Sequence, residues 1–155
     1  IIYIPILFHT LYGLVVIGYS RLRGMAAYAY PRNALFWWQR FTGIVLILFI
    51  FWHAITLRFG VFNFNFISEN DPTFKVMAAT FNPLVYTAYI IGVIATSYHF
   101  CNGLFTAGLT WGITIGPKAQ TAAARFWLLM ALGMSALWIA IATTFFLGSP
   151  NGLAG

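Results

Sequence analysis

Three histidines interrupt long apolar stretches of the 155-residue sequence and are its strongest candidates for chemistry. His99 lies about three helical turns from either end of the apolar run 82–110. Ionisable side chains at membrane depth are costly and usually face the interior of a helix bundle. A single imidazole there is expected to serve as a metal ligand, a proton relay or a hydrogen-bonded structural group.

The segments around His9 and His99 share a local pattern, because Gly13 and Gly103 each follow a histidine by four residues. In a helix this spacing puts histidine and glycine on the same face, one turn apart. A missing side chain beside a metal ligand lets a broad planar group such as a porphyrin lie close to the backbone. Small residues also permit close packing of membrane helices. The pair favours haem held by two imidazoles, and we predict that both glycines contact it.

The overall composition predicts an all-α, polytopic membrane helix bundle. The sequence is 61% hydrophobic, 19% aromatic and only 6% charged, with a mean hydropathy of +0.86, which excludes a soluble domain of this length. Its single cysteine, Cys101, excludes a disulfide framework. The net charge of +6 comes from residues at the ends of apolar runs, so it indicates membrane topology, and nucleic acid is excluded as a partner.

The hydropathy pattern predicts one membrane domain with four visible transmembrane spans, at approximately 1–20, 34–58, 82–110 and 124–147. The pair Asn82-Pro83 has the residue types expected of a helix cap followed by a first-turn proline. Residues 59–81 contain Glu69 and Asp71 and are expected to form an external loop. Because the sequence opens within an apolar run and without Met, we expect further chain before Ile1.

The distribution of basic residues predicts that the first and third links face the cytoplasm. These residues are Arg21, Arg23, Arg32 and Arg40 at the first link, and Lys118 and Arg125 at the third. His9 and His99 then each lie roughly 18 Å from the cytoplasmic end of their helix, so they are level and are able to share one iron. His53 lies about 10 Å further out and is assigned to a second site. With three histidines in the chain, a second axial ligand there is expected from outside residues 1–155.

Arg40 is a further candidate site residue, because its charge is suited to neutralising haem propionates. Lys118 is a weaker candidate, since it lies in a link, whereas Arg40 lies inside an apolar helix. Basic residues at cytoplasmic helix ends are also explained by topology alone, and both interpretations stay open. The sequence has no nucleophile–base pair, phosphate loop or thiolate metal site. These features predict a protein that carries electrons and not one that contains a catalytic centre.

Five short strings together resemble the di-haem cytochrome b membrane anchor of succinate:quinone oxidoreductases, the succinate dehydrogenase and fumarate reductase complexes. They are Arg32-Asn33-Ala34-Leu35-Phe36, Gln39-Arg40-Phe41-Thr42-Gly43-Ile44, Trp52-His53, His99-Phe100-Cys101-Asn102-Gly103-Leu104 and Thr110-Trp111-Gly112-Ile113-Thr114. The resemblance implies a five-helix anchor with two b haems in a bacterial cytoplasmic membrane. One haem would be fully ligated by His9 and His99, and the other would be ligated on one side by His53, with its second ligand on the absent first helix.

The same resemblance implies partner subunits and a quinone. A flavoprotein subunit and an iron–sulfur subunit would dock on the cytoplasmic side, and a quinone, menaquinone being favoured, would bind near the outer haem within membrane lipid. Succinate oxidation and fumarate reduction both remain open. Two alternatives also remain: a haem b subunit of another quinone-linked complex, such as a hydrogenase or nitrate reductase, and a transporter-like subunit without haem whose histidines relay protons.

Overall fold

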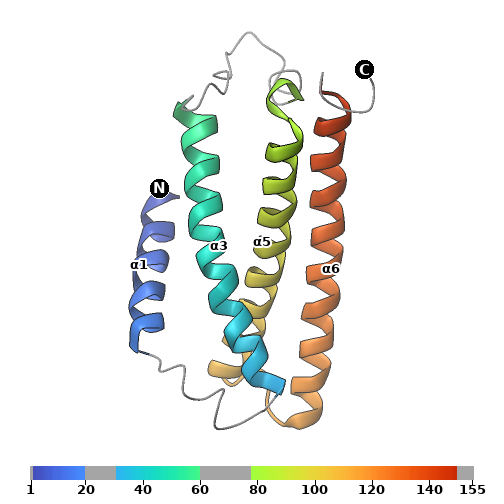
Figure 1. Ribbon diagram of the computed structural model, residues 1–155. Coiled ribbons are helices and arrows are strands. Elements are labelled where there is room, and N and C mark those ends of the chain that lie inside the picture. Colours follow the sequence, from blue (N-terminus) through green and yellow to red (C-terminus); the bar gives the residue numbers. More distant parts are fainter. Residues whose placement is uncertain (1, 20–30, 60–77, 150–155) are drawn as a thin grey trace.

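The chain forms a bundle of long helices. The structure, a computed structural model, describes residues 2–19, 31–59 and 78–149, and within these residues it contains helices and no strand. The long helices are α1 (Tyr3–Tyr19), α3 (Pro31–Phe59), α5 (Pro83–Thr110) and α6 (Pro117–Leu147). They run alternately in opposite directions, α1 and α5 towards one end of the bundle and α3 and α6 towards the other (Figure 1). The predicted all-α membrane helix bundle is confirmed.

Prolines mark where the helices begin. α5 starts at Pro83, and the Asn82 side chain caps it by accepting hydrogen bonds from the backbone N–H groups of Leu84 and Val85, each at 3.0 Å. α6 starts at Pro117, directly after Gly116, whose φ of 87° is readily adopted only by glycine. The sequence pattern had placed the start of this last span near Ala124. The helix begins earlier because proline at its first position initiates it in the polar link.

Three helices have the length and apolar character needed to cross a membrane within the described residues, over Ala34–Leu57, Pro83–Thr110 and Pro117–Leu147. The helix α1 is apolar but has only 17 residues, which is the lower limit for a span. The predicted external loop lies largely outside the described residues, with both Glu69 and Asp71. The ends of the predicted first span, Ile1 and Ser20, also lie outside them.

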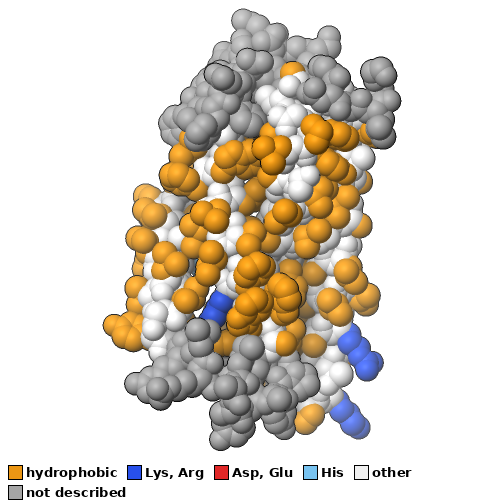
Figure 2. All heavy atoms as spheres, in the orientation of Figure 1, with side chains coloured by type: hydrophobic (Ala, Val, Ile, Leu, Met, Phe, Trp, Pro, Cys, Tyr) orange, Lys and Arg blue, Asp and Glu red, His pale blue; other side chains and the backbone are white. Residues whose placement is uncertain are grey.

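Helix packing is uneven across the bundle. The helix α5 packs along α6 and α3, whereas α1 meets α3 sparsely and has no buried residue. At one end of the bundle, Phe81, Val85 and Ala142 form a buried core against which Trp52 and Tyr86 pack. Apolar side chains cover the visible outer face along its length (Figure 2). Such a surface is unsuited to water and suits contact with lipid.

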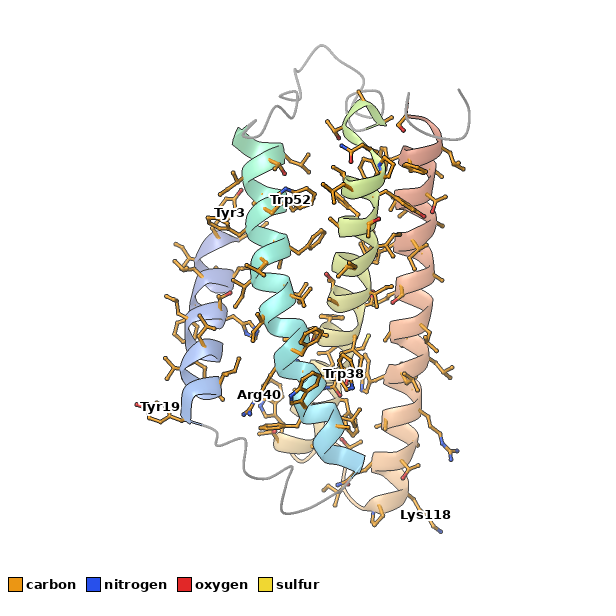
Figure 3. All side chains as sticks on the ribbon, in the orientation of Figure 1. Tyr3, Tyr19, Trp38, Arg40, Trp52 and Lys118 are labelled. Atoms are coloured by element: carbon orange, nitrogen blue, oxygen red, sulfur yellow. The ribbon has the colours of Figure 1, made fainter. Side chains whose placement is uncertain are left out.

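Basic side chains gather at the end of the bundle where α1 and α5 finish and α3 and α6 begin. Arg40 lies near this end between α1 and α3, and Lys118 lies at the start of α6 (Figure 3). That this end faces the cytoplasm stays a prediction.

Candidate functional site

His9 of α1 and His99 of α5 face each other across the bundle. Their ring centroids are 6.3 Å apart, and the ring planes are nearly perpendicular at 89°. Two metal–imidazole bonds of about 2 Å, together with the distance from each nitrogen to its ring centre, sum to about 6 Å. The structure therefore brings the two predicted ligands to a separation that suits one metal ion between them.

The second ring nitrogen of His99 is held by α3. Nδ1 lies 3.1 Å from the backbone oxygen of Gln39 and 3.2 Å from the hydroxyl oxygen of Thr42. His99 is half-buried, whereas His9 on the sparsely packed α1 is exposed. Metal-ligating histidines typically donate their other N–H to a carbonyl or a similar acceptor, which fixes the ring orientation. The surroundings of His99 match this pattern.

A polar cluster links α3 to α5 beside His99. The Gln39 side chain donates to the backbone oxygen of His99 at 3.0 Å and accepts from the Asn102 side chain at 2.8 Å. Asn102 is 8% exposed, so its side-chain amide is shielded from the lipid or water around the bundle. Hydrogen bonds between side chains of neighbouring membrane helices contribute roughly 1 kcal/mol each. The cluster fixes how the two helices are placed along and around each other.

His53 lies in a separate aromatic cluster on α3 and α5. Its Nδ1 is 2.8 Å from the hydroxyl oxygen of Tyr89, and its ring stacks on Phe49 with centroids 5.8 Å apart. Tyr89 precedes His99 by ten residues on α5, which corresponds to about 15 Å along the helix. The expected 10 Å between His53 and the level of the His9/His99 pair assumed a helix start at Ala34, whereas α3 begins at Pro31. A second site remains the interpretation of His53.

The two glycines that follow the histidines have different surroundings. A Cβ added at Gly13 would meet nothing within 4 Å, so the face of α1 beside His9 is open. A Cβ at Gly103 would lie 3.4 Å from the Gln39 side chain, so that glycine lies against α3. A third glycine is closer to a histidine than either, because a Cβ at Gly43 would lie 3.2 Å from Cε1 of His99.

Arg40 is half-buried, and its guanidinium lies 3.6 Å from the centre of the Phe36 ring, one turn back on α3. In the part of the chain that the structure describes, Arg40 meets no carboxylate, because both acidic residues lie within 60–77. Haem propionates would supply the missing negative charge. The propionate role of Arg40 remains a prediction, beside the topological explanation.

The residues that contact the histidine ring nitrogens were not predicted from the sequence. Gln39, Thr42 and Gly43 are spaced i, i+3 and i+4, which places them on one helix face. That spacing was available in the sequence, but the rotation that turns this face towards His99 was not. Tyr89 was missed for the same reason, since its partner is on another helix.

The fold defines a class, an all-helical membrane protein, in which α1 and α5 bring the ring centroids of His9 and His99 within 6.3 Å of each other. A family model described as "Succinate dehydrogenase/Fumarate reductase transmembrane subunit" matches residues 19–142. The chain belongs to this family, as its sequence motifs had indicated.

A curated relative supports the same assignment. The succinate dehydrogenase cytochrome b558 subunit of Bacillus subtilis (strain 168) is 34% identical over 136 residues, which are 87% of this chain and 64% of that relative. The chain thus spans somewhat less than two thirds of the relative's length. No solved structure matches the chain.

Proposed function

We propose that this chain is a haem b-binding membrane anchor of a succinate:quinone oxidoreductase. In this role it carries electrons between a cytoplasmic iron–sulfur subunit and a membrane quinone such as menaquinone. The observation that carries the proposal is the facing pair His9 and His99 in a member of the succinate dehydrogenase/fumarate reductase transmembrane family. The dicarboxylate chemistry would belong to a flavoprotein subunit on the same side.

The donor set fits haem iron. The imidazoles of His9 and His99, on separate helices, would hold the metal, and the exposed His9 and open Gly13 leave space beside α1 for a large planar group. When bound, haem supplies one-electron exchange. His9 and His99 would both hold one haem, and His53 would hold one side of a second, whose other ligand would come from outside residues 1–155.

The chain's own residues then orient the ligands and exclude water. Gln39 and Thr42 fix the His99 ring, while Tyr89 fixes the His53 ring. Apolar helix surfaces give both sites a low dielectric, and low dielectric together with hydrogen bonding to the ligands tunes a redox potential. Arg40 would offset the negative charge of a propionate. A bacterial cytoplasmic membrane is the expected location, consistent with the Bacillus relative.

A reduced-minus-oxidised optical spectrum of the purified complex tests the proposed function. We expect the sharp bands of low-spin b haem and co-purification of flavoprotein and iron–sulfur subunits. Purification with subunits of a hydrogenase or nitrate reductase would assign the chain to another quinone-linked complex. A preparation without haem would end the electron-transfer interpretation and favour histidines that relay protons.

Leucine at Gly13 is expected to prevent haem binding at the His9/His99 site, and alanine to weaken it. The reason is that Gly13 lies one turn from His9 and opens onto the space that a porphyrin would occupy. The measurement is haem content per chain, compared with Gly133→Leu, because Gly133 on α6 is also open. Equal haem content in the Gly13→Leu and Gly133→Leu variants would show that Gly13 does not adjoin the haem.

Phenylalanine at Tyr89 is expected to shift the signal of the haem at His53 without removing it. The substitution keeps the ring contacts with Phe49 and Phe81 but removes the hydroxyl 2.8 Å from Nδ1 of His53. Loss of one such outer hydrogen bond typically costs roughly tenfold or more in metal affinity. A redox titration that resolves the two haems checks this prediction. A shift at the other haem instead would show that His53 and Tyr89 are assigned to the wrong site.

A further inference from the structure

Three residues of α3 surround one edge of the His99 ring. They are the backbone carbonyl of Gln39, the hydroxyl of Thr42, and Gly43, whose missing side chain leaves room for Cε1. We call this group the imidazole seat. All three contacts come from a single turn of α3, although His99 itself belongs to α5.

The hydrogen-bond acceptors in the seat determine which nitrogen of His99 carries the hydrogen. Thr42 has one hydroxyl hydrogen, and its oxygen lies 2.7 Å from the Trp38 carbonyl and 3.2 Å from the Gln39 carbonyl. Because the hydroxyl donates to a carbonyl on its own helix, it can only accept from the histidine. The Gln39 carbonyl likewise only accepts. Both neighbours of Nδ1 are therefore acceptors, and Nδ1 must be the protonated nitrogen.

We propose that Gln39, Thr42 and Gly43 are positioning residues that fix the tautomer and plane of the His99 imidazole, so that Nε2 is the nitrogen offered to a ligand. The inference rests on the proposed function where it concerns haem, but the tautomer itself follows from the hydrogen bonds alone. His99 thus belongs to α5, whereas the residues that orient its ring belong to α3.

Gly43 contributes by its size. A Cβ at this position would lie 3.2 Å from Cε1, which is tighter than ordinary van der Waals contact. Cε1 lies between the two ring nitrogens, so pushing it away moves Nε2 as well as Nδ1. Alanine at this position is expected to turn the ring away from the orientation that Thr42 and Gln39 define.

The amide pair beside the seat keeps α3 in place. Gln39 donates to the backbone oxygen of His99 and accepts from Asn102, so residue 39 holds α5 with its side chain while its carbonyl contacts the ring. A slip of α3 along α5 would break these bonds together. The seat and the helix pairing are therefore one structural unit.

His53 offers an informative contrast. Its Nδ1 partner is the Tyr89 hydroxyl, which can donate or accept, so the geometry does not fix the tautomer there. Farther along α3, Thr56 also repeats the local bonding of Thr42, with its hydroxyl 2.7 Å from the Trp52 carbonyl and 3.2 Å from the His53 carbonyl. Both threonines are buried, at 6% and 1% exposed. Thr56 is thus a matched control whose hydroxyl bonds within its own helix.

The test compares Thr42→Val, Thr42→Ser and Thr56→Val in the intact complex by redox titration. A hydrogen bond donated from Nδ1 makes the imidazole a stronger ligand, which favours oxidised iron. Thr42→Val should therefore raise the reduced-to-oxidised ratio of the His9/His99 haem at a fixed potential by up to about tenfold, about 59 mV for one electron. Thr42→Ser should restore the wild-type ratio, and Thr56→Val should leave this haem unchanged. Equal shifts in the two valine variants would contradict the proposal that Thr42 positions the His99 ring.

A second measurement does not depend on haem. The ¹⁵N spectrum of dithionite-reduced protein with labelled histidine reports the protonated nitrogen of His99 directly. We expect Nδ1–H in the wild type, and a hydrogen on Nε2 would overturn the proposal. If the complex contains no haem, the proposed function fails, and this spectrum alone tests whether the seat fixes the tautomer of His99. If Thr42→Val does not accumulate, the wild-type spectrum and the serine variant still test the proposal.

Discussion

Leucine in place of His9 or of His99 is expected to abolish the same haem signal in the difference spectrum and to leave a second signal largely intact. The two side chains face each other with ring centroids 6.3 Å apart, so loss of either leaves the shared metal with one protein ligand. Because haem binding at this site needs both imidazoles, we expect complete loss of the signal from each single variant.

The two substitutions should differ in their effect on the stability of the haem-free protein. His99→Leu loses the hydrogen bond that Nδ1 makes with Gln39 and Thr42, whose net contribution to stability is about 0.5–1.5 kcal/mol. His9 is exposed on α1, and replacing it should change the stability of the bundle little. His53→Leu is the control and should remove the other haem signal. Loss of different signals from His9→Leu and His99→Leu would show that the pairing is wrong.

Alanine at Gly92 is expected to destabilise the bundle by about 1–3 kcal/mol or more, the largest packing effect of any single added methyl that we predict. A Cβ at this position would overlap the ring of Phe49 on the facing helix α3. Phe49 stacks on His53 and meets Tyr89 edge-on at 5.5 Å, so displacing it should also disturb the outer site.

Unfolding of the purified protein in detergent checks the Gly92 prediction. Gly133→Ala is the matched control, because a Cβ there meets nothing within 4 Å and alanine favours a helix over glycine by about 1 kcal/mol. Adding Phe49→Leu to Gly92→Ala should recover part of the lost stability, since the smaller side chain makes room. A Gly92→Ala variant as stable as Gly133→Ala would mean that α3 and α5 are less closely packed than the structure shows.

Local sequence signals predicted the helices well where capping residues, prolines or basic links mark the helix ends. Asn82-Pro83 marked the start of α5, and the alternation of apolar runs with basic links indicated the bundle. The common level of His9 and His99 followed from counting residues between charges and histidines, because a helix rises by a constant amount per residue. The structure brings these two residues together.

Helix rotation and register were harder to obtain from the sequence. Which face of α3 meets α5 is decided by packing between helices, so Thr42 and Gly43 could not be assigned to His99 beforehand. The predicted height of His53 along its helix depended on where that helix begins. The start at Pro31, three residues before the expected Ala34, changes this height by about 5 Å. Gly103 illustrates the same difficulty, since its spacing from His99 was visible but its contact with Gln39 was not.

The most direct test of the haem assignment is an experimental density map of the intact membrane complex in which haem and side chains are resolved. We expect one iron between His9 and His99, bound by Nε2 of His99 and one ring nitrogen of His9 at about 2 Å each. We also expect Nδ1 of His99 to remain on the Gln39 carbonyl and the Thr42 hydroxyl. A map in which the two histidines face lipid, or bind different irons, would contradict the central claim.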